Sequence, residues 1–229
     1  MSLSSKVQIV DSVPANAAGN MAWDLALLAQ SSLVSTASLR AYTWENPEAV
    51  TIGKYQPTAL ISSTTRDWAR RPTGGGLVDH TDDSLTWSLI IPNSLIPITG
   101  PGVKWVYAIL QDAMRQTIET SLRFKTDQVK TSPSSRPEIC FREPRVEDLI
   151  NERRQKISGM ALYRNRSGIL VQGSLQHLPY RMDTDAFLRK FAQQIFKTKS
   201  LRSPVITTLI CNDAYQSELQ KVLLAAQIE

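Results

Sequence analysis

The segment from residue 70 to residue 80 reads Arg70-Arg71-Pro72-Thr73-Gly74-Gly75-Gly76-Leu77-Val78-Asp79-His80 and is the most unusual stretch of the chain. Three consecutive glycines leave the backbone bare and allow positive φ, so a ligand can lie directly on the peptide groups. The pattern suits an elongated ligand with an apolar part over the glycines and an anionic part near the arginines. A plain glycine-rich turn between strands is the alternative. No Gly-Lys-Ser/Thr follows, which excludes a Walker loop.

A second segment, Lys156-Ile157-Ser158-Gly159-Met160-Ala161, opens a predicted strand with a lysine. Small residues follow the lysine, so its ammonium can project over a cleft. There it can donate a hydrogen bond to a carbonyl oxygen that gains negative charge during a reaction. A solvated surface lysine is the competing interpretation.

The composition is that of a globular chain of one domain, which we expect to extend over residues 1–229. Its 229 residues are 42% hydrophobic and 21% charged, which provides enough apolar material for a packed core and argues against disorder. The 10 glycines and 12 prolines exclude collagen-like and low-complexity classes. The two cysteines cannot build a disulfide framework, and no secretory signal is recognisable. We therefore expect a reducing, cytoplasmic environment.

The charge pattern favours an acidic partner over nucleic acid or a membrane. The net charge of +5 suits an anionic small molecule or an acidic carrier protein, and a solvated surface without a specific partner is the alternative. No run of five like charges occurs and the basic residues are not interleaved with aromatics, so we predict no nucleic-acid partner. The longest uncharged stretch, residues 84–103, contains Pro92, Pro97 and Pro101 and therefore does not predict a membrane span.

The apolar periodicity predicts strands in runs with helices between them, and no regular βαβ alternation. Helices are expected after a cap at Asn20, over residues 103–122 and 183–196, and after a cap at Asn212 or Asp213. Strands are expected at residues 39–44, 49–52, 76–80, 85–92, 147–150, 157–163, 168–175 and, as a strand or a buried connection, 205–210. Residues 85–91 alternate as a half-buried strand does, and residues 126–137 are typical of an exposed loop. These elements favour a mixed, mainly antiparallel sheet with helices packed on it.

Taken in order, four motifs resemble those of one known family. They are Asn20-Met21-Ala22-Trp23-Asp24, the arginine and glycine segment, the Lys156 segment, and Gln172-Gly173-Ser174-Leu175. The order resembles the catalytic domain of the biotinyl/lipoyl protein ligase family, which contains lipoate-protein ligases, octanoyltransferases and biotin ligases. The resemblance covers residues 20–175. It implies an α/β (α+β) fold with a large mixed, mainly antiparallel sheet, a smaller sheet and flanking helices, and an acyl tunnel between the glycine strand and the lysine strand.

Within that family the chain is most similar to the cysteine-dependent octanoyltransferases. Residues 82–88, which read Asp-Asp-Ser-Leu-Thr-Trp-Ser, look like the Glu-Leu-Thr-Tyr-Ser pattern of those enzymes. Ile139-Cys140-Phe141, followed by Pro144 and by Asp148-Leu149, looks like their catalytic cysteine segment. Arg142 and Arg145 flank this cysteine, and nearby cations favour the reactive thiolate form. Cys140 as a small buried hydrophobe stays an alternative. Cys211 lies outside the motifs and is interpreted as a packing residue.

The resemblance implies an acyltransferase of protein lipoylation. Acyl carrier protein brings an octanoyl or lipoyl thioester, Cys140 attacks it, and Lys156 stabilises the oxyanion. A lysine of a lipoyl-domain protein then receives the acyl group. His80 is a candidate base for that lysine, or a structural residue that holds the glycine strand. No metal and no cofactor are expected. The substrate-binding residues that the resemblance implies are Arg70, Arg71, Thr73, Gly74, Gly75, Gly76, Gly159, Gly173 and Ser174.

Two departures from the family pattern leave other functions open. Gln172 stands where a histidine is usual, and Asp79 adds a charge before His80. One alternative is a lipoate-protein ligase that uses ATP and Mg²⁺. In that enzyme Lys156 acts on an acyl-adenylate, Arg70 contacts the phosphate, and Asp79 or Asp82 helps to hold the metal. The other alternative is a non-catalytic member that binds an acyl group or a lipoyl domain. His177 is expected on the surface.

Overall fold

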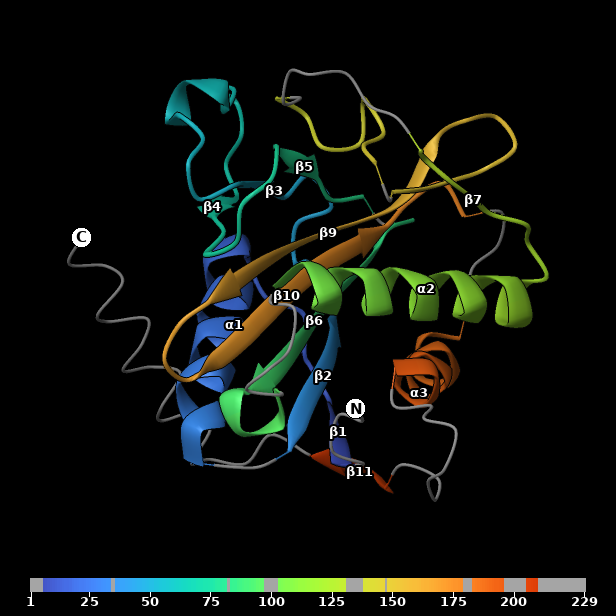
Figure 1. Ribbon diagram of the computed structural model, residues 1–229. Helices are drawn as coiled ribbons and strands as arrows, with labels where there is room; N and C mark the ends of the chain where they lie inside the picture. Colours follow the sequence, from blue (N-terminus) through green and yellow to red (C-terminus); the bar gives the residue numbers. More distant parts are fainter. Residues whose placement is uncertain are drawn as a thin grey trace.

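The computed structural model describes residues 6–33, 36–81, 83–96, 103–130, 138–146, 148–178, 183–195 and 205–209. These residues form an eight-stranded sheet, a three-stranded sheet and three α-helices (Figure 1). The large sheet contains β1 (Lys6–Val10), β2 (Ala37–Tyr42), β6 (Leu85–Pro92), β7 (Asp127–Gln128), β8 (Leu149–Ile150), β9 (Lys156–Arg164), β10 (Gly168–Leu175) and β11 (Val205–Leu209). The small sheet contains β3 (Val50–Ile52), β4 (Trp68–Arg70) and β5 (Val78–Asp79). The helices are α1 (Ala17–Gln30), α2 (Val103–Leu122) and α3 (Thr184–Ile195), with 3₁₀ turns η1 (Ser31–Leu33), η2 (Thr58–Leu60) and η3 (Asn93–Leu95).

The strand order of the large sheet is β11-β1-β2-β6-β10-β9-β8-β7. β1 pairs in parallel with both β11 and β2, and the other neighbouring pairs of this sheet are antiparallel. The small sheet has the order β4-β3-β5, with one parallel and one antiparallel pair. The predicted fold class, a large and mainly antiparallel sheet with a smaller sheet and flanking helices, is confirmed.

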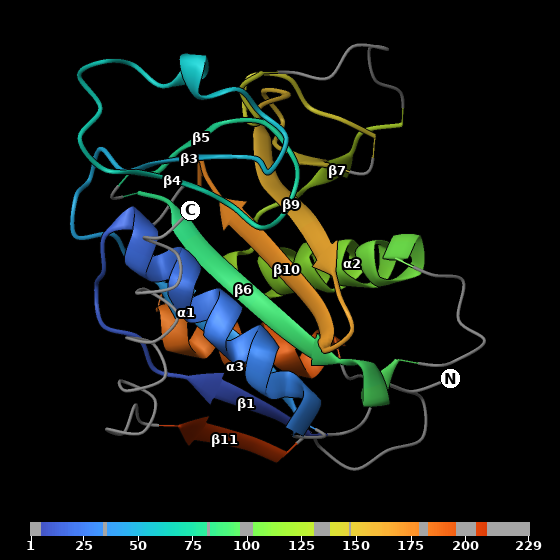
Figure 2. The same cartoon turned by 90° about the vertical axis from the view of Figure 1, so that its left-hand side faces the viewer.

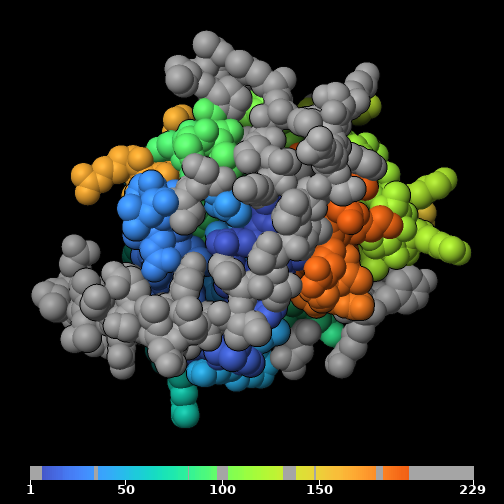
Figure 3. Space-filling model, turned by 90° about the horizontal axis from the view of Figure 1, so that it is seen from below, coloured from blue at the N-terminus to red at the C-terminus, as the bar shows by residue number. Residues whose placement is uncertain are grey.

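The helices cover both faces of the large sheet. α2 and α3 pack against each other on one face, and the space-filling view from below shows them side by side (Figure 3). The main core lies between these helices and the central strands, where the ring of Trp87 meets the edge of Phe191 with centroids 5.1 Å apart. α1 lies on the opposite face, against β6 and β10 (Figure 2). Within the described part of the chain, no helix is long and apolar enough to cross a membrane.

The central strands β6 and β10 are buried at every position. The alternation in residues 85–91 predicted a strand with one exposed face, and this prediction is wrong. The polar face of β6 carries Thr86 and Ser88, but α1 packs on this face and Thr86 bonds to Trp44 and His80, so that both residues lie inside the protein. Polar groups buried there need a hydrogen-bond partner or a ligand.

Several element boundaries agree with the sequence prediction, and the start of α1 does not. The predicted helix over residues 103–122 is α2 itself. α1 begins at Ala17, because Asn16 is its N-cap and accepts a 2.8 Å hydrogen bond from the Gly19 amide. Asn20 is buried instead, and its side-chain amide donates to two backbone carbonyls. The sequence did not predict β1, β4 or β7, and the predicted final helix lies outside the described residues.

Candidate active site

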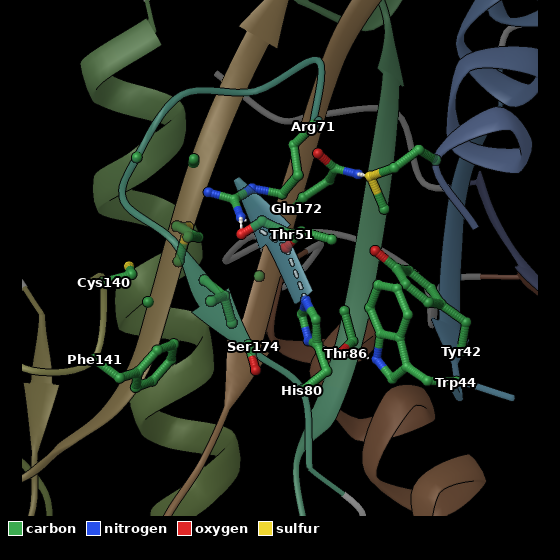
Figure 4. Close-up of a pocket in the computed structure, with 17 residues that line it drawn as sticks. Tyr42, Trp44, Thr51, Arg71, His80, Thr86, Cys140, Phe141, Gln172 and Ser174 are labelled. Carbon is green, nitrogen blue, oxygen red and sulfur yellow. Dashed lines mark hydrogen bonds between the residues drawn. The ribbon is translucent and has the colours of Figure 1, made fainter. Parts of the chain in front are cut away.

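A pocket lies between the α1 face of the large sheet and the glycine segment (Figure 4). Part of its lining is a row of residues paired across four neighbouring strands: Gly159 on β9, Ser174 on β10, Thr86 on β6 and Tyr42 on β2. Most of the other lining side chains are apolar, among them Met21, Trp44, Val78, Phe141, Met160 and Ala161. An apolar chain laid across the strands would match this lining.

Arg71 holds the glycine segment in place from inside the protein. Its side chain is 7% exposed, and Nη1 donates to the carbonyl and the hydroxyl of Thr51. Nη2 donates to the carbonyls of Gly74 and Gly76, at 3.1 and 2.7 Å. Between these two carbonyls Gly75 has a φ of 92°, which residues with a side chain rarely adopt. The structure therefore places Arg71 as a brace for the loop, with its guanidinium beside the pocket.

Arg70 and Gly53 support the same segment from its outer side. Arg70 is exposed, and its Nη1 donates to the backbone carbonyls of residues 53, 54 and 56. A Cβ at Gly53 would lie 2.0 Å from the carbonyl oxygen of Gly75, so only glycine allows the two backbones to approach this closely. Sequence reasoning missed Gly53, because nothing in its local pattern indicates a contact with residue 75.

Gln172 connects the glycine segment to α1. Thr73 Oγ1 donates to Gln172 Oε1 at 2.8 Å, and Gln172 Nε2 donates to Asp24 Oδ2 at 2.7 Å. Asp24 is fully buried and also accepts hydrogen bonds from Arg40 Nη1 and Ser88 Oγ, at 3.0 and 2.6 Å. An amide has a donor and an acceptor at its end, so the glutamine completes this bridge without a titratable group. The resemblance singled out the position, and only the structure shows its partners.

Cys140 lies beside the glycine segment because the two stretches of chain pair with each other. Leu77 and Ile139 form a parallel bridge. The Leu77 amide donates to the Glu138 carbonyl, and the Cys140 amide donates to the Leu77 carbonyl, both at 2.7 Å. The Cys140 thiol is partly buried and lines the pocket, on the same side as Phe141 in Figure 4.

Lys156 brings a buried ammonium to this cysteine. Its side chain is 4% exposed, and Nζ lies 3.4 Å from Cys140 Sγ and 2.7 Å from Asp148 Oδ2. The end of the lysine passes directly over Gly159, where a Cβ would lie 2.5 Å from Cε and 2.8 Å from Nζ. The Phe141 ring covers the ammonium, with its centroid 5.2 Å from Nζ. Gly159 is therefore the residue that lets Lys156 reach the face of β9 that lines the pocket.

Asp148 holds the ammonium of Lys156 from behind. Its Oδ2 also accepts a 2.7 Å hydrogen bond from the Arg145 amide, and Oδ1 accepts one from the Tyr107 hydroxyl at 3.4 Å. Burial raises the pKa of Asp148, and the neighbouring Lys156 ammonium opposes that rise. The pair is buried on both sides, so the carboxylate determines where the ammonium points. The sequence singled out Asp148 only as part of the cysteine segment and assigned it no role.

His80 lies across the pocket from Cys140 and is buried (Figure 4). Its ring stacks on Trp44, with centroids 3.9 Å apart and planes 23° apart. Nε2 is 2.8 Å from Thr51 Oγ1, and Nδ1 is 3.3 Å from Thr86 Oγ1. Burial, and after it the positive charge of Arg71, lowers the pKa of His80 to about 3. The imidazole is therefore neutral near neutral pH, and each of its nitrogens has a threonine hydroxyl as partner.

Gly173 and Ser174 face opposite sides of β10. A Cβ at Gly173 would lie 2.4 Å from the ring of Trp87, so this glycine is needed for close packing toward the main core. Ser174 is 4% exposed and lines the pocket, and its Oγ has no hydrogen-bond partner among the described residues. His177, expected on the surface, is exposed.

The residues considered for a metal are not brought together in the part of the chain that the structure describes. No three of its His, Cys, Asp and Glu side chains are close enough to share an ion. Asp79 is exposed on β5, while Asp82 and Cys211 lie outside the described residues.

Comparisons with known proteins agree with the motifs. A family model described as the lipoyl protein ligase A/B catalytic domain matches residues 16–211. The chain belongs to this family. The octanoyltransferase LipM of Oceanobacillus iheyensis is 30% identical over 210 residues, which cover 86% of this chain and 73% of the relative. The octanoyltransferase LipM of Anoxybacillus flavithermus is 31% identical over 219 residues, which cover 85% and 76%. The family predicted from the four motifs is confirmed.

Solved structures of lipoate-protein ligases share the fold of this family member. Lipoate-protein ligase A bound with ATP has a TM-score of 0.69 and 16% identity, over 95% of this chain and 94% of that chain. The bi-partite lipoate protein ligase of Thermoplasma acidophilum, described together with its E2 lipoyl domain, has a TM-score of 0.69 and 14% identity, over 95% and 91%. At these identities the likeness establishes the fold.

Proposed function

We propose that this family member is an acyltransferase of protein lipoylation, which moves an octanoyl group from a carrier thioester to a lysine of a lipoyl-domain protein. The contact of 3.4 Å between Lys156 Nζ and Cys140 Sγ at an apolar pocket carries the proposal. A thiol beside a cation has the environment of a reactive nucleophile. The octanoyltransferase relatives support the choice of the acyl group.

In the first step the Cys140 thiolate attacks the thioester carbon of the octanoyl carrier protein. The Lys156 ammonium donates to the oxyanion that forms, an interaction worth about 3 kcal/mol for one good donor. A carbon–sulfur bond to Cys140 forms, the bond to the carrier sulfur breaks, and the carrier thiolate takes up the proton that the Cys140 thiol released when it ionised. Acyl carrier protein is acidic and this chain has a net charge of +5, so their encounter is electrostatically favoured.

In the second step the amine of the acceptor lysine attacks the acyl group on Cys140. The amide bond forms, the Cys140 thiolate leaves, and the proton of the amine passes to that thiolate. His80 is not the base in this step, because its pKa is lowered to about 3 and both ring nitrogens are hydrogen-bonded to threonines. Lys156, 3.4 Å from the thiolate that leaves, is placed to relay the proton.

The proposal requires no metal and no ATP. In the ligase alternative Arg70 would hold a phosphate, but its Nη1 already donates to the carbonyls of residues 53, 54 and 56. Direct transfer needs only an acyl thioester, a nucleophile and a donor for the oxyanion, and Cys140 and Lys156 supply the last two. Acyl carrier protein as donor and the cytoplasm as location are part of this proposal.

The test is to mix the protein with octanoyl carrier protein, without ATP and without an acceptor. We expect one octanoyl mass to be added and hydroxylamine to remove it, as intact-protein mass spectrometry would show. Cys140→Ser should lose the adduct or hold it as a more stable ester. Cys211→Ser is the matched control and should behave as the wild type does. After an apo lipoyl domain is added, the octanoyl group should leave Cys140 and appear on the lysine of that domain.

The opposite result would contradict the acyltransferase proposal and support an ATP-dependent lipoate-protein ligase. In that case no adduct forms, transfer of the free acid requires ATP and Mg²⁺, and Cys140→Ser retains it. Failure of both donors to acylate the lipoyl domain would favour the non-catalytic alternative.

A further inference from the structure

We propose that the stacked rings of Trp44 and His80 form the wall that stops the acyl chain, and that this wall sets the acyl length that the enzyme accepts. The inference rests on the proposed function and goes beyond it, because it assigns a specificity-determining role to Trp44, which none of the motifs contains. Both rings line the pocket, and both lie on its far side from Cys140 (Figure 4).

The row of paired residues across β9, β10 and β6 gives the length of the course that we propose for the acyl chain. Gly159 lies under the end of Lys156, and Ser174 and Thr86 follow it on the next two strands. Two strand spacings of the sheet amount to about 10 Å. An extended octanoyl chain has seven carbon–carbon bonds, each of which advances it by about 1.3 Å, so it spans about 9 Å. A chain bound through its carbonyl near Gly159 therefore has its methyl end near Thr86.

At Thr86 the path meets the two rings. Trp44 Nε1 donates to Thr86 Oγ1 at 3.1 Å, and His80 Nδ1 is 3.3 Å from the same oxygen. One hydroxyl thus ties both rings to β6. The Tyr42 ring meets Trp44 at an angle of 64°, with centroids 5.5 Å apart, and supports it from the next strand. A wall held by stacking and hydrogen bonds yields little to an extra methylene.

The wall also presents an apolar surface to the methyl end of the acyl chain, because its polar groups are already paired. The Trp44 N–H and both His80 nitrogens already have partners, so an apolar chain end leaves none of them unsatisfied. The indole and imidazole faces offer an apolar contact surface. By contrast, the reactive end carries Lys156 and Asp148 as a charged pair.

The pocket has a second corner, at Met21. There Gln172, two residues before Ser174 on β10, has its Nε2 3.3 Å from Met21 Sδ and 2.7 Å from Asp24 Oδ2. A chain that turned toward this corner would run along the strands and past a polar amide. The Trp44 side offers the straight and apolar course, and Met21→Ala tests the alternative course.

The experiment measures the rate of Cys140 acylation by hexanoyl, octanoyl, decanoyl and dodecanoyl carrier protein. The wild type should disfavour decanoyl and dodecanoyl by about tenfold or more relative to octanoyl. In Trp44→Ala the longer chains should react within about threefold of octanoyl, because the wall is open. Trp44→Phe keeps a ring and should keep most of the discrimination. Trp68→Ala removes a ring of the same kind on β4, outside the pocket, and should keep the wild-type profile. Met21→Ala tests the second corner and should not extend acceptance to longer chains.

Several outcomes would overturn the proposal that Trp44 and His80 limit the acyl length. One is a Trp44→Ala protein that acylates and discriminates as the wild type does. Another is a shift toward long chains in Met21→Ala instead. If Trp44→Ala does not fold, as judged by its thermal melt, Trp44→Leu replaces it, with the same expected loss of discrimination. A wild type that forms no octanoyl adduct overturns the proposed function itself, whereas a wild type that reacts with octanoyl and longer chains equally overturns only the wall.

Discussion

The groups next to the two ends of the pocket are buried to the same degree but differ in their electrostatics, since Lys156 and His80 are each 4% exposed. At one end Lys156 and Asp148 are buried as a charged pair beside Cys140. At the other end His80 is buried as a neutral ring between Trp44 and two threonines. Burial alone disfavours every charge. The partners differ at the two ends: Lys156 has a carboxylate 2.7 Å away, whereas burial and, after it, the charge of Arg71 lower the pKa of His80 to about 3. In the proposed mechanism the chemistry takes place at the Cys140 end, and the acyl chain is recognised at the other end.

The largest effect is expected when the charged end loses its cation. Lys156→Ala should slow acylation of Cys140 about 10²–10³-fold, because the oxyanion loses its donor. It should also destabilise the fold by about 3–5 kcal/mol, since the buried carboxylate of Asp148 is left unpaired. Single-turnover acylation and urea unfolding measure the two effects.

A double variant separates these two effects. Lys156→Ala with Asp148→Asn removes the unpaired charge, so stability should partly return while acylation stays slow. Lys54→Ala, at an exposed lysine, is the control. Near wild-type acylation in a folded Lys156→Ala protein would contradict the role of the ammonium.

A smaller effect is expected when the cation stays and its carboxylate is neutralised. Asp148→Asn should slow acylation about tenfold or more, because the ammonium is no longer oriented toward the thiol. Single-turnover acylation measures this effect. Asp112→Asn, which neutralises an exposed carboxylate on α2, should leave the acylation rate unchanged. A wild-type acylation rate in Asp148→Asn would reduce Asp148 to a packing residue.

Between the two ends, the glycine segment offers a matched pair of substitutions. Gly75→Ala must adopt a φ of 92°, at a cost of about 1–2 kcal/mol. Its Cβ would also enter the space between Arg71 and Ala161, so octanoyl transfer should slow about tenfold. A Cβ at Gly74 meets no atom within 4 Å, so Gly74→Ala should stay within about twofold of the wild type. Thermal melts and acylation rates, measured on both variants, check the contrast. Equal behaviour of the two would mean that the chain does not pass over Gly75.

The smallest effect concerns the neutral end and appears in stability. The pKa of His80 is about 3 in the folded protein against 6.5 when unfolded, so the unfolded chain binds more protons between these values. The stability that His80 contributes is therefore complete above its unfolded pKa and is lost as the pH falls toward the folded value. Between about pH 7.5 and about pH 5.5 the loss amounts to about 1.4 kcal/mol. Urea unfolding at both pH values should show that the free energy of unfolding of His80→Gln falls by about 1.4 kcal/mol less than that of the wild type. An equal fall in both proteins would mean that His80 accepts a proton in the folded state.

Much of the site could be predicted from the amino-acid sequence. The triple glycine, the lysine strand and the cysteine segment are short motifs whose chemistry depends on residue type and local order. The pocket accordingly holds Gly75, Cys140, Gly159 and Ser174 among its lining. The prediction that β6 is half-buried failed, because the strand pattern cannot show that a second layer covers its polar face.

Residues whose role depends on partners distant in sequence were not predictable. Gly53 is required by the backbone of Gly75, and Trp44 is held by a hydroxyl on β6. For His80 the sequence left two roles open, a base or a structural residue, and its burial and threonine partners favour the structural one.

By itself, then, the sequence determined the family, the mainly antiparallel sheet and the segments that contain Cys140 and Lys156, since these follow from local patterns and residue chemistry. The tertiary structure decided which groups surround Lys156 and His80 and which rings line the pocket opposite Cys140. Both depend on distances between strands and loops far apart in the chain, such as the 3.4 Å from Lys156 to Cys140 and the 3.9 Å from Trp44 to His80. Desolvation and Coulomb interactions act through space, so they are settled only when the chain has folded.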